Sequence, residues 1–235
     1  EILERIYSQL AAQQVQIHAP NLDMALSLLD AEAVAIETAP RRLGFRASPV
    51  WAQERDVLLR RLRALIEYDF NELNTKISKK FGASAPRYPY QTETPFGVTG
   101  NNTLLTLDDG TVLPIGGYID RIDRVGDQAL VIDYKSGSSL ISTKELEEGR
   151  SFQIMFYALA MRRILAAQGN GPLQDVLGGF FFHIRTPDIS GLLSLSDEEH
   201  IETVERAQRF LSSYVHHARA GNFAVSPSKP EQNRR

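Results

Sequence analysis

The spacing of the apolar residues changes near residue 90, and that change is the feature that most limits what the chain can fold into. Before it, apolar residues recur at helical spacing in three stretches, which are residues 2–10, 22–39 and 48–79. After it, alternation with a period of two predicts strands at residues 90–96, 103–107, 111–124 and 128–136. Short turn sequences such as Val125-Gly126-Asp127 join these strands, so we expect an antiparallel meander.

The remainder of the chain returns to helical spacing on both sides of one strongly apolar run. A helix is predicted from Ser142 to about Gln168, with a possible restart after Gly149, and a closing helix ends near Gly221. The run 176–184 is apolar at successive positions, which is typical of a buried central strand. The sequence thus predicts an α/β fold in which a mixed sheet is flanked by helices.

The same pattern predicts how the chain is divided. We expect one domain over residues 1–225, with a helical part at 1–89 and an α/β core at 90–225. Residues 226–235 are polar and contain proline, and we expect them to form a loose tail.

Composition removes several classes of function. The 235 residues are 43% hydrophobic and 23% charged, and they contain no cysteine, which excludes a disulfide framework and a zinc site built on thiolates. A net charge of −3 does not by itself indicate a nucleic-acid partner. No apolar run is long enough to span a membrane, so we expect a cytoplasmic protein with no membrane partner. The P-loop, zinc-protease, serine-hydrolase and dinucleotide-binding motifs are absent.

Two carboxylates and an amine are predicted to lie together on the hairpin around Gly126. Alternation puts Asp133 and Lys135 on one face of the strand 128–136, and a near-symmetric hairpin brings Asp120 close to Asp133. Oxygen ligands at this spacing suit Mg²⁺, and a nearby ammonium suits the charge that develops in phosphodiester hydrolysis. The Asp-x-Lys pattern is short and common, and it also fits solvated strand carboxylates paired with Arg121, Arg124 or Lys135.

Three motifs follow one another between Gly117 and Tyr157. They are Gly117-Tyr-Ile-Asp120-Arg-Ile-Asp123, Val131-Ile-Asp133-Tyr-Lys135-Ser-Gly137 and Gln153-Ile-Met-Phe-Tyr157. In this order they resemble the GxIDRxD strand, the (V/I)DYK(S/T)G strand and the QxxxY helix of the RecB/AddB-type branch of the PD-(D/E)xK nuclease superfamily.

The resemblance implies a restriction-endonuclease-like fold and a metal-dependent DNA nuclease. It implies that Asp120 and Asp133 bind Mg²⁺ or Mn²⁺, that the Tyr134 carbonyl contributes, and that Lys135 is the catalytic lysine. Because the resemblance is closest to nuclease domains that accompany helicase motors, it also implies a role in DNA repair or recombination. No motor motif is present in this sequence, so a helicase would have to be another domain or another chain.

Four further residues are candidates for lining the site. Gln153 and Tyr157 share one helix face, which the resemblance places beside the metal and towards DNA. Glu93 lies in the first strand, where relatives commonly carry an acidic residue, and Glu54 lies in the long helix, from which superfamily members sometimes draw one. The structural alternatives are a core Tyr157 with a surface Gln153, a strand-edge charge at Glu93, and an intrahelical partner of Arg55 at Glu54.

The resemblance also extends to both ends of the sequence. Residues 1–7 are similar to the stretch that follows a metal-binding histidine in AddB-like relatives, and residues 221–227 to the segment that precedes a cysteine cluster holding an iron–sulfur cluster. We therefore expect a fragment of a longer chain, with that histidine before Glu1 and cysteines after Arg235. Without cysteine, these residues alone cannot hold an iron–sulfur cluster.

Two alternatives to a nuclease stay open at this point. A catalytically silent DNA-binding or scaffold module of the same fold would have no chemical reason to keep Asp120, Asp133 and Lys135 together. A two-carboxylate hydrolase acting on a sugar or a small phosphoester would leave Lys135 and the Gln153–Tyr157 face unused. We expect a Mg²⁺-dependent deoxyribonuclease, an exonuclease, with DNA and a helicase motor domain or subunit as its partners.

Overall fold

The computed structural model describes residues 1–38, 49–98, 103–107, 109–137, 139–169 and 171–223. Its helical segments are α1 (Ile2–Ala12), the 3₁₀ turn η1 (Ala19–Asn21), α2 (Leu22–Thr38), α3 (Trp51–Tyr68), the π-helical turn η3 (Asp69–Leu73), α4 (Asn74–Phe81), α5 (Thr143–Glu147), α6 (Gln153–Gln168) and α7 (Glu198–Arg219). Its strands are β1 (Arg87–Phe96), β2 (Thr103–Thr106), β3 (Val112–Ile115), β4 (Gly117–Val125), β5 (Gln128–Lys135), β6 (Asp175–His183) and β7 (Asp188–Ser194).

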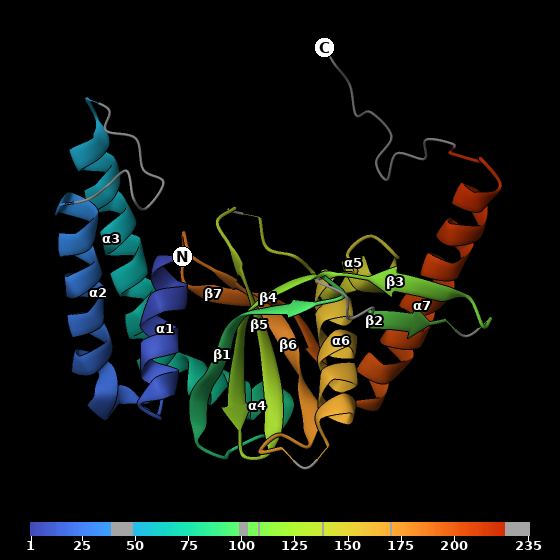
Figure 1. Cartoon of the computed structure of the whole chain (residues 1–235), viewed down its shortest axis with the longest axis horizontal. Helices are drawn as coiled ribbons and strands as arrows, with labels where there is room; N and C mark the ends of the chain where they lie inside the picture. The colour runs from blue at the N-terminus through green and yellow to red at the C-terminus, as the bar shows by residue number, and fades with distance from the viewer. Residues whose placement is uncertain (39–48, 99–102, 108, 138, 170, 224–235) are drawn as a thin grey trace.

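A five-stranded mixed sheet of order β1-β4-β5-β6-β7 forms the middle layer of the molecule (Figure 1). Strand β4 is antiparallel to β1 and β5, β5 is parallel to β6, and β6 is antiparallel to β7. Helices α1 to α4 cover one face of the sheet, and α5 to α7 cover the other. The sequence prediction of a mixed α/β sheet flanked by helices is confirmed.

The apolar run at 176–184 forms the buried strand that its composition predicts. All residues of β6 after Asp175 are buried, and the strand lies between β5 and β7. Phe180 and Phe182 point to the core on the α1 side, whereas Phe181 points to the core on the α6 side. Such a strand has no solvated face, which explains why its sequence does not alternate.

The strand prediction is wrong in two places. Residues 111–124 form two strands, β3 and β4, and β3 pairs with β2 in a separate two-stranded sheet, so that the meander of the main sheet contains β1, β4 and β5 only. The break between β3 and β4 lies where the chain passes close to Gly97: Gly97 has a φ of +61°, and a Cβ on it would overlap the carbonyl oxygen of Ile115. Strand β7 has no counterpart in the sequence prediction, because Ser190 and Gly191 interrupt its apolar pattern.

The long helix predicted over residues 48–79 is confirmed from Trp51 onward, but it runs to Phe81 and contains a π-helical turn. Helices α3 and α4 are joined directly by η3, and Asp69, Phe70 and Leu73 of that turn are all buried. A π turn changes the angular position of the residues that follow it, so it can bring a residue into the core that a straight α-helix would place elsewhere. The predicted start of this helix at Ser48 lies outside the described residues.

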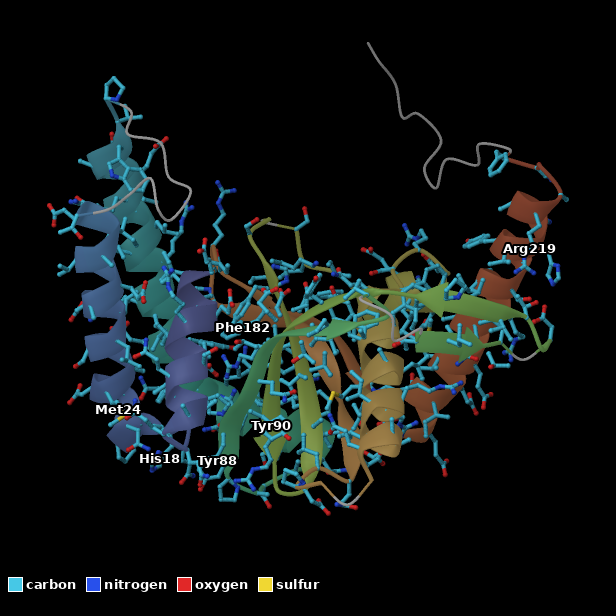
Figure 2. All side chains as sticks on the ribbon, viewed as in Figure 1. His18, Met24, Tyr88, Tyr90, Phe182 and Arg219 are labelled. Carbon is cyan, nitrogen blue, oxygen red and sulfur yellow. The ribbon has the colours of Figure 1, made fainter. Side chains whose placement is uncertain are left out.

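Aromatic rings pack this helix against the sheet. The ring of Phe182 lies 6.0 Å from those of Tyr68 and Tyr134, and 6.4 Å from that of Phe180. Figure 2 shows Phe182 in the crowded interior between the first helices and the sheet. Buried aromatic clusters contribute a large share of the burial energy of a domain, so this contact fixes the helical part against β5 and β6.

Among the helices that the structure describes, none has the length and apolar character needed to cross a membrane.

Candidate active site

Strand β5 carries Asp133 and Lys135 on the face that α6 covers. Alternation sends Leu130 and Ile132 to the core on the α1 side, so the residues between and after them face α6. The side chain of Asp133 is only 3% exposed, and Lys135 Nζ lies 2.6 Å from Asp133 Oδ2. The lysine is 27% exposed and reaches the surface beside the carboxylate.

Gln153 binds both members of this pair. Helix α5 ends and α6 restarts after Gly149, which has a φ of +69°, and Gln153 becomes the first residue of α6. Its amide Nε2 donates to Asp133 Oδ1 (2.8 Å) and to the Tyr157 hydroxyl (2.8 Å), while its Oε1 accepts from Lys135 Nζ (2.7 Å). The amide matches both charges in this orientation because its nitrogen faces the carboxylate and its oxygen faces the ammonium.

Asp120 reaches the site from β4. The register pairs Arg121 with Ile132, so that Asp120 comes opposite Asp133 at the end of the paired region. Asp120 Oδ2 accepts a 2.8 Å hydrogen bond from the main-chain N–H of Tyr134. The two carboxylates therefore come from neighbouring strands, and each is held by a separate hydrogen bond.

Glu93 and Asp120 line the same cavity, which has a volume of about 340 Å³. Glu93 lies in β1 between the Thr92–Arg121 and Thr94–Ile119 pairs, and its φ of +48° is unusual for a residue with a side chain. Partial burial, together with the nearby carboxylates of Asp120 and Glu4, raises the pKa of Glu93. Tyr134, Ile184, two leucines of α3 and residues 1–4 complete the wall.

Glu54 is the candidate that the structure leaves apart. It is exposed in the first turn of α3, and it is not among the residues that line this cavity, although Leu58 one turn later is. The structure thus brings together Asp133, Lys135, Gln153 and Tyr157 by direct hydrogen bonds. Asp120 lies opposite Asp133 on β4 and shares the cavity with Glu93.

Burial gives Asp133 an unusual affinity for protons. Burial raises the pKa of this carboxyl group to about 6, Lys135 only partly offsets the rise, and the negative charge of Asp120 adds to it. Asp133 Oδ2 is buried and pairs with the Lys135 ammonium at 2.6 Å, but none of the described residues forms a hydrogen bond of good geometry with it. A cation placed between Asp120 and Asp133 would therefore relieve an electrostatic cost that the protein carries without it.

This pKa leads to a prediction about stability without metal. Because the folded protein holds the Asp133 proton more tightly than the unfolded chain does, its stability should rise as the pH falls from about 6 towards 4. Relative to Asp133→Asn, the free energy of unfolding of the parent should gain up to about 3 kcal/mol between pH 7 and pH 4. Urea unfolding of both proteins with a chelator measures this gain, and a difference that does not change with pH would contradict it.

A second charged cluster lies on the other face of the sheet, and the sequence analysis missed it. Asp69, Arg87, Arg121 and Asp123 are each at most 2% exposed. Arg121 donates to Asp69 (2.8 Å) and, with two nitrogens, to Asp123 (2.7 and 2.6 Å), and Arg87 also donates to both aspartates. Two positive and two negative groups thus neutralise one another inside the protein. We call these four residues the buried ion cluster.

The buried ion cluster argues against the alternative that Asp120 and Asp133 are solvated carboxylates paired with Arg121. Arg121 pairs with Asp69 and Asp123 rather than with the site carboxylates, and Asp133 is a buried residue rather than a solvated one. The sequence does contain features that could have predicted this cluster. Arg121 and Asp123 are two residues apart in a strand and so share a face, and Asp69 adjoins the apolar stripe of the long helix. Charged residues at core-facing positions indicate a buried, mutually paired set.

The donor atoms of the site fit a hard cation. Asp120 and Asp133 offer carboxylate oxygens, and strand β5 adds main-chain oxygens, which is the ligand type that Mg²⁺ prefers. In the part of the chain that the structure describes, no group of three or more His, Cys, Asp or Glu side chains is arranged to enclose a metal. That is compatible with Mg²⁺, which usually takes one or two carboxylates and keeps several waters.

Comparison with known proteins identifies the family. A sequence profile of the PD-(D/E)XK nuclease superfamily matches residues 1–231. The chain is 34% identical over 116 residues to an ATP-dependent helicase/deoxyribonuclease subunit of Exiguobacterium sibiricum, a match that covers 46% of this chain and 9% of the relative. Proteins of the same name from Bacillus mycoides and Bacillus anthracis are 27% identical over 132 residues and 28% identical over 120 residues, covering 52% and 47% of this chain.

These relatives are much longer than the region they share with this chain, since the match spans 9% to 11% of their length. The family profile, in contrast, extends over nearly all of the chain, including the strands that carry Asp120, Asp133 and Lys135. The sheet order, the paired carboxylates and the profile agree, and the chain belongs to the PD-(D/E)XK nuclease superfamily.

Proposed function

We propose that this domain is a metal-dependent deoxyribonuclease that hydrolyses DNA phosphodiester bonds with Mg²⁺ or Mn²⁺. The observation that carries the proposal is the contact of Lys135 with both Asp133 and Gln153, with Asp120 opposite them on β4. Membership of a nuclease superfamily and the deoxyribonuclease names of its relatives support the reaction class. A small-phosphoester or sugar hydrolase would leave this lysine and glutamine without a role.

The carboxylates of Asp120 and Asp133, with the Tyr134 carbonyl, would hold the metal. When bound, the metal supplies positive charge for the phosphate and lowers the pKa of water. Lys135 then donates from Nζ to a non-bridging phosphate oxygen, whose charge grows in the transition state. A water oxygen forms the new bond to phosphorus and loses a proton, while the bond from phosphorus to the leaving sugar oxygen breaks and that oxygen takes up a proton.

The surrounding residues are proposed to position these groups and the DNA. Gln153 holds Lys135 and Asp133 in a fixed relative orientation through both ends of its amide. Tyr157 is half-buried, accepts a hydrogen bond from Gln153, and packs edge-on against Phe96 with ring centroids 5.7 Å apart, so it lines the approach to the site. Glu93 lines the cavity on the Asp120 side, and Glu54, on the exposed first turn of α3, would contact DNA outside it.

The biological setting is also a proposal. The relatives are named as subunits of an ATP-dependent helicase/deoxyribonuclease. We propose that this domain acts as an exonuclease in DNA repair or recombination, in the cytoplasm, on DNA delivered by a helicase motor domain or subunit.

The direct test is incubation of the protein with labelled linear duplex DNA and single-stranded DNA, in Mg²⁺, in Mn²⁺ and in chelator. We expect fragments in the presence of either metal and intact DNA in chelator. Shortening from the ends, with covalently closed circles left intact, is the result expected of an exonuclease. Binding of DNA without cleavage under any of these conditions would instead indicate a catalytically silent DNA-binding module of the same fold.

Replacement of Lys135 should separate metal binding from turnover. Lys135→Ala should lower the single-turnover rate by about 10²-fold or more, because one stabiliser of the transition-state charge is lost. Calorimetry should show Mn²⁺ binding retained, since the carboxylates remain. Lys144→Ala is the matched control, because Lys144 is 72% exposed and its carboxylate neighbour is the surface residue Glu148. Restoration of the rate by excess Mg²⁺ would mean that Lys135 supports metal binding rather than the reaction.

A further inference from the structure

Tyr134 links the two faces of the sheet. It lies between Asp133 and Lys135 in β5, and its side chain points to the opposite face. Its main-chain N–H donates to Asp120 Oδ2 (2.8 Å), while its hydroxyl accepts from Arg121 Nη1 (3.0 Å). The same residue thus touches a carboxylate of the candidate site and the buried ion cluster.

Arg121 is held at every side of its guanidinium group. Asp123 binds Nε and Nη2 as a two-pronged pair, at 2.7 and 2.6 Å, and Asp69 binds Nη1 at 2.8 Å. The group also stacks on the ring of Tyr7, with 3.5 Å between the guanidinium carbon and the ring centroid. Bidentate arginine–carboxylate pairs are geometrically specific, so Arg121 is a fixed point to which the Tyr134 hydroxyl is attached.

The contacts that begin at the Tyr134 hydroxyl and pass through Arg121 end at the π-helical turn. Asp69 is the first residue of η3, is fully buried, and accepts from Arg121, from Arg87 and from the Tyr7 hydroxyl. Well-packed apolar residues in place of buried ion pairs are often as stabilising or more so. Stability alone therefore does not explain why this cluster is charged, and π turns within α-helices are frequent at functional sites.

We propose that the contacts from Asp69 through Arg121 to the Tyr134 hydroxyl position the catalytic strand, and with it Asp120 and Asp133. The inference rests on the proposed function, because it names residues that position the metal-binding carboxylates. Asp69, Arg121 and the Tyr134 hydroxyl are positioning groups and touch neither metal nor DNA. The ring of Tyr134 stacks on Phe182 at 25° between planes, which holds the side chain in line with Arg121.

The test compares two tyrosine-to-phenylalanine variants that each remove one hydroxyl. Tyr134→Phe keeps the ring, the main-chain N–H and the carbonyl, and removes only the bond to Arg121. Tyr68→Phe is the matched control: its ring also lies 6.0 Å from Phe182, but its hydroxyl binds Asp188. Calorimetry with Mn²⁺ in the absence of DNA should show an affinity loss of about 10-fold for Tyr134→Phe and no loss for Tyr68→Phe.

A third variant distinguishes positioning from general loss of stability. Tyr7→Phe removes the hydroxyl that donates to Asp69, in the same cluster, but keeps the bond between Arg121 and Tyr134. It should lower the melting temperature and leave Mn²⁺ affinity unchanged. Equal losses of affinity in Tyr7→Phe and Tyr134→Phe would overturn the inference, because the site would then follow stability alone.

Single-turnover cleavage over a range of Mn²⁺ concentrations gives the second measurement. The Tyr134→Phe curve should shift to higher Mn²⁺ by the same factor as the binding curve. A parent protein that neither binds Mn²⁺ nor cleaves DNA would overturn the proposed function and this inference together. A parent that binds and cleaves, beside a Tyr134→Phe protein with the same affinity, would overturn this inference only.

Discussion

Asp133→Asn should produce a folded protein whose DNA cleavage in Mg²⁺ is reduced by at least about 10³-fold. The change keeps the size of a side chain that is only 3% exposed but removes one negative ligand charge, and it leaves Lys135 without its carboxylate partner. Because burial already raises the pKa of Asp133 to about 6, a neutral side chain is tolerated there without metal. Cleavage of labelled linear DNA under single-turnover conditions measures the loss.

The matched control for this result is Asp127→Asn. Asp127 is exposed in the turn at the other end of the same hairpin, and its replacement also changes the net charge by one. The control should cleave at the parent rate. Metal-stimulated cleavage at the parent rate by the folded Asp133→Asn protein would remove Asp133 from the ligand set and leave the proposed metal site without support.

Asp69→Ala should give the largest loss of stability, about 3–5 kcal/mol in the free energy of unfolding at pH 7. The substitution leaves two buried arginines with one carboxylate fewer and the Tyr7 hydroxyl without its acceptor. Exposed pairs contribute far less, so Asp30→Ala, which breaks the surface pair with Arg63, should cost about 1 kcal/mol at most. Urea unfolding of the three proteins under one set of conditions measures both losses.

The loss at Asp69 should also depend on pH. Burial alone would raise the pKa of Asp69, but Arg121 and Arg87 outweigh burial and hold the pKa at about 2. Because its pKa is lowered, the Asp69 carboxylate stabilises the fold fully at pH values above 3.8, the ordinary pKa of this group. This contribution declines as the pH falls from there towards 2. The difference between parent and Asp69→Ala should therefore be constant between about pH 5 and pH 7 and shrink below about pH 4. A difference that grows in acid would contradict this account.

The parts of the site that are close in sequence could be predicted from it. Alternation in β5 fixes the common face of Asp133 and Lys135, and a hairpin with a short turn fixes the position of Asp120 opposite them. Gly149 in the sequence indicates that the helix restarts after it, and the restarted helix has Gln153 and Tyr157 on one face. Each of these relations depends on fewer than about 20 residues, a range over which period and turn length decide the geometry.

The parts that depend on distant segments could not be predicted. Asp69 and Arg121 are 52 residues apart, and Tyr7 and Asp69 are 62 apart, so no local period relates them. The position of Asp69 depends on the π turn, and hydrophobic periodicity does not distinguish such a turn from regular helix. The separation of β2 and β3 from the main sheet likewise depends on the close approach of Gly97 to Ile115, which is a tertiary contact.

The alternation of β5 allows the proposed reaction groups to be replaced without loss of the fold. Asp133 and Lys135, the proposed reaction groups, project to the α6 side, whereas Tyr134 between them is anchored among the first helices. Loss of a charge on the α6 side should therefore leave the packing on the α1 side in place. A folded protein that has lost Asp133 should therefore still present an intact surface to its substrate. Such a variant would serve as a trap that holds uncut DNA long enough for its path across the domain to be seen directly.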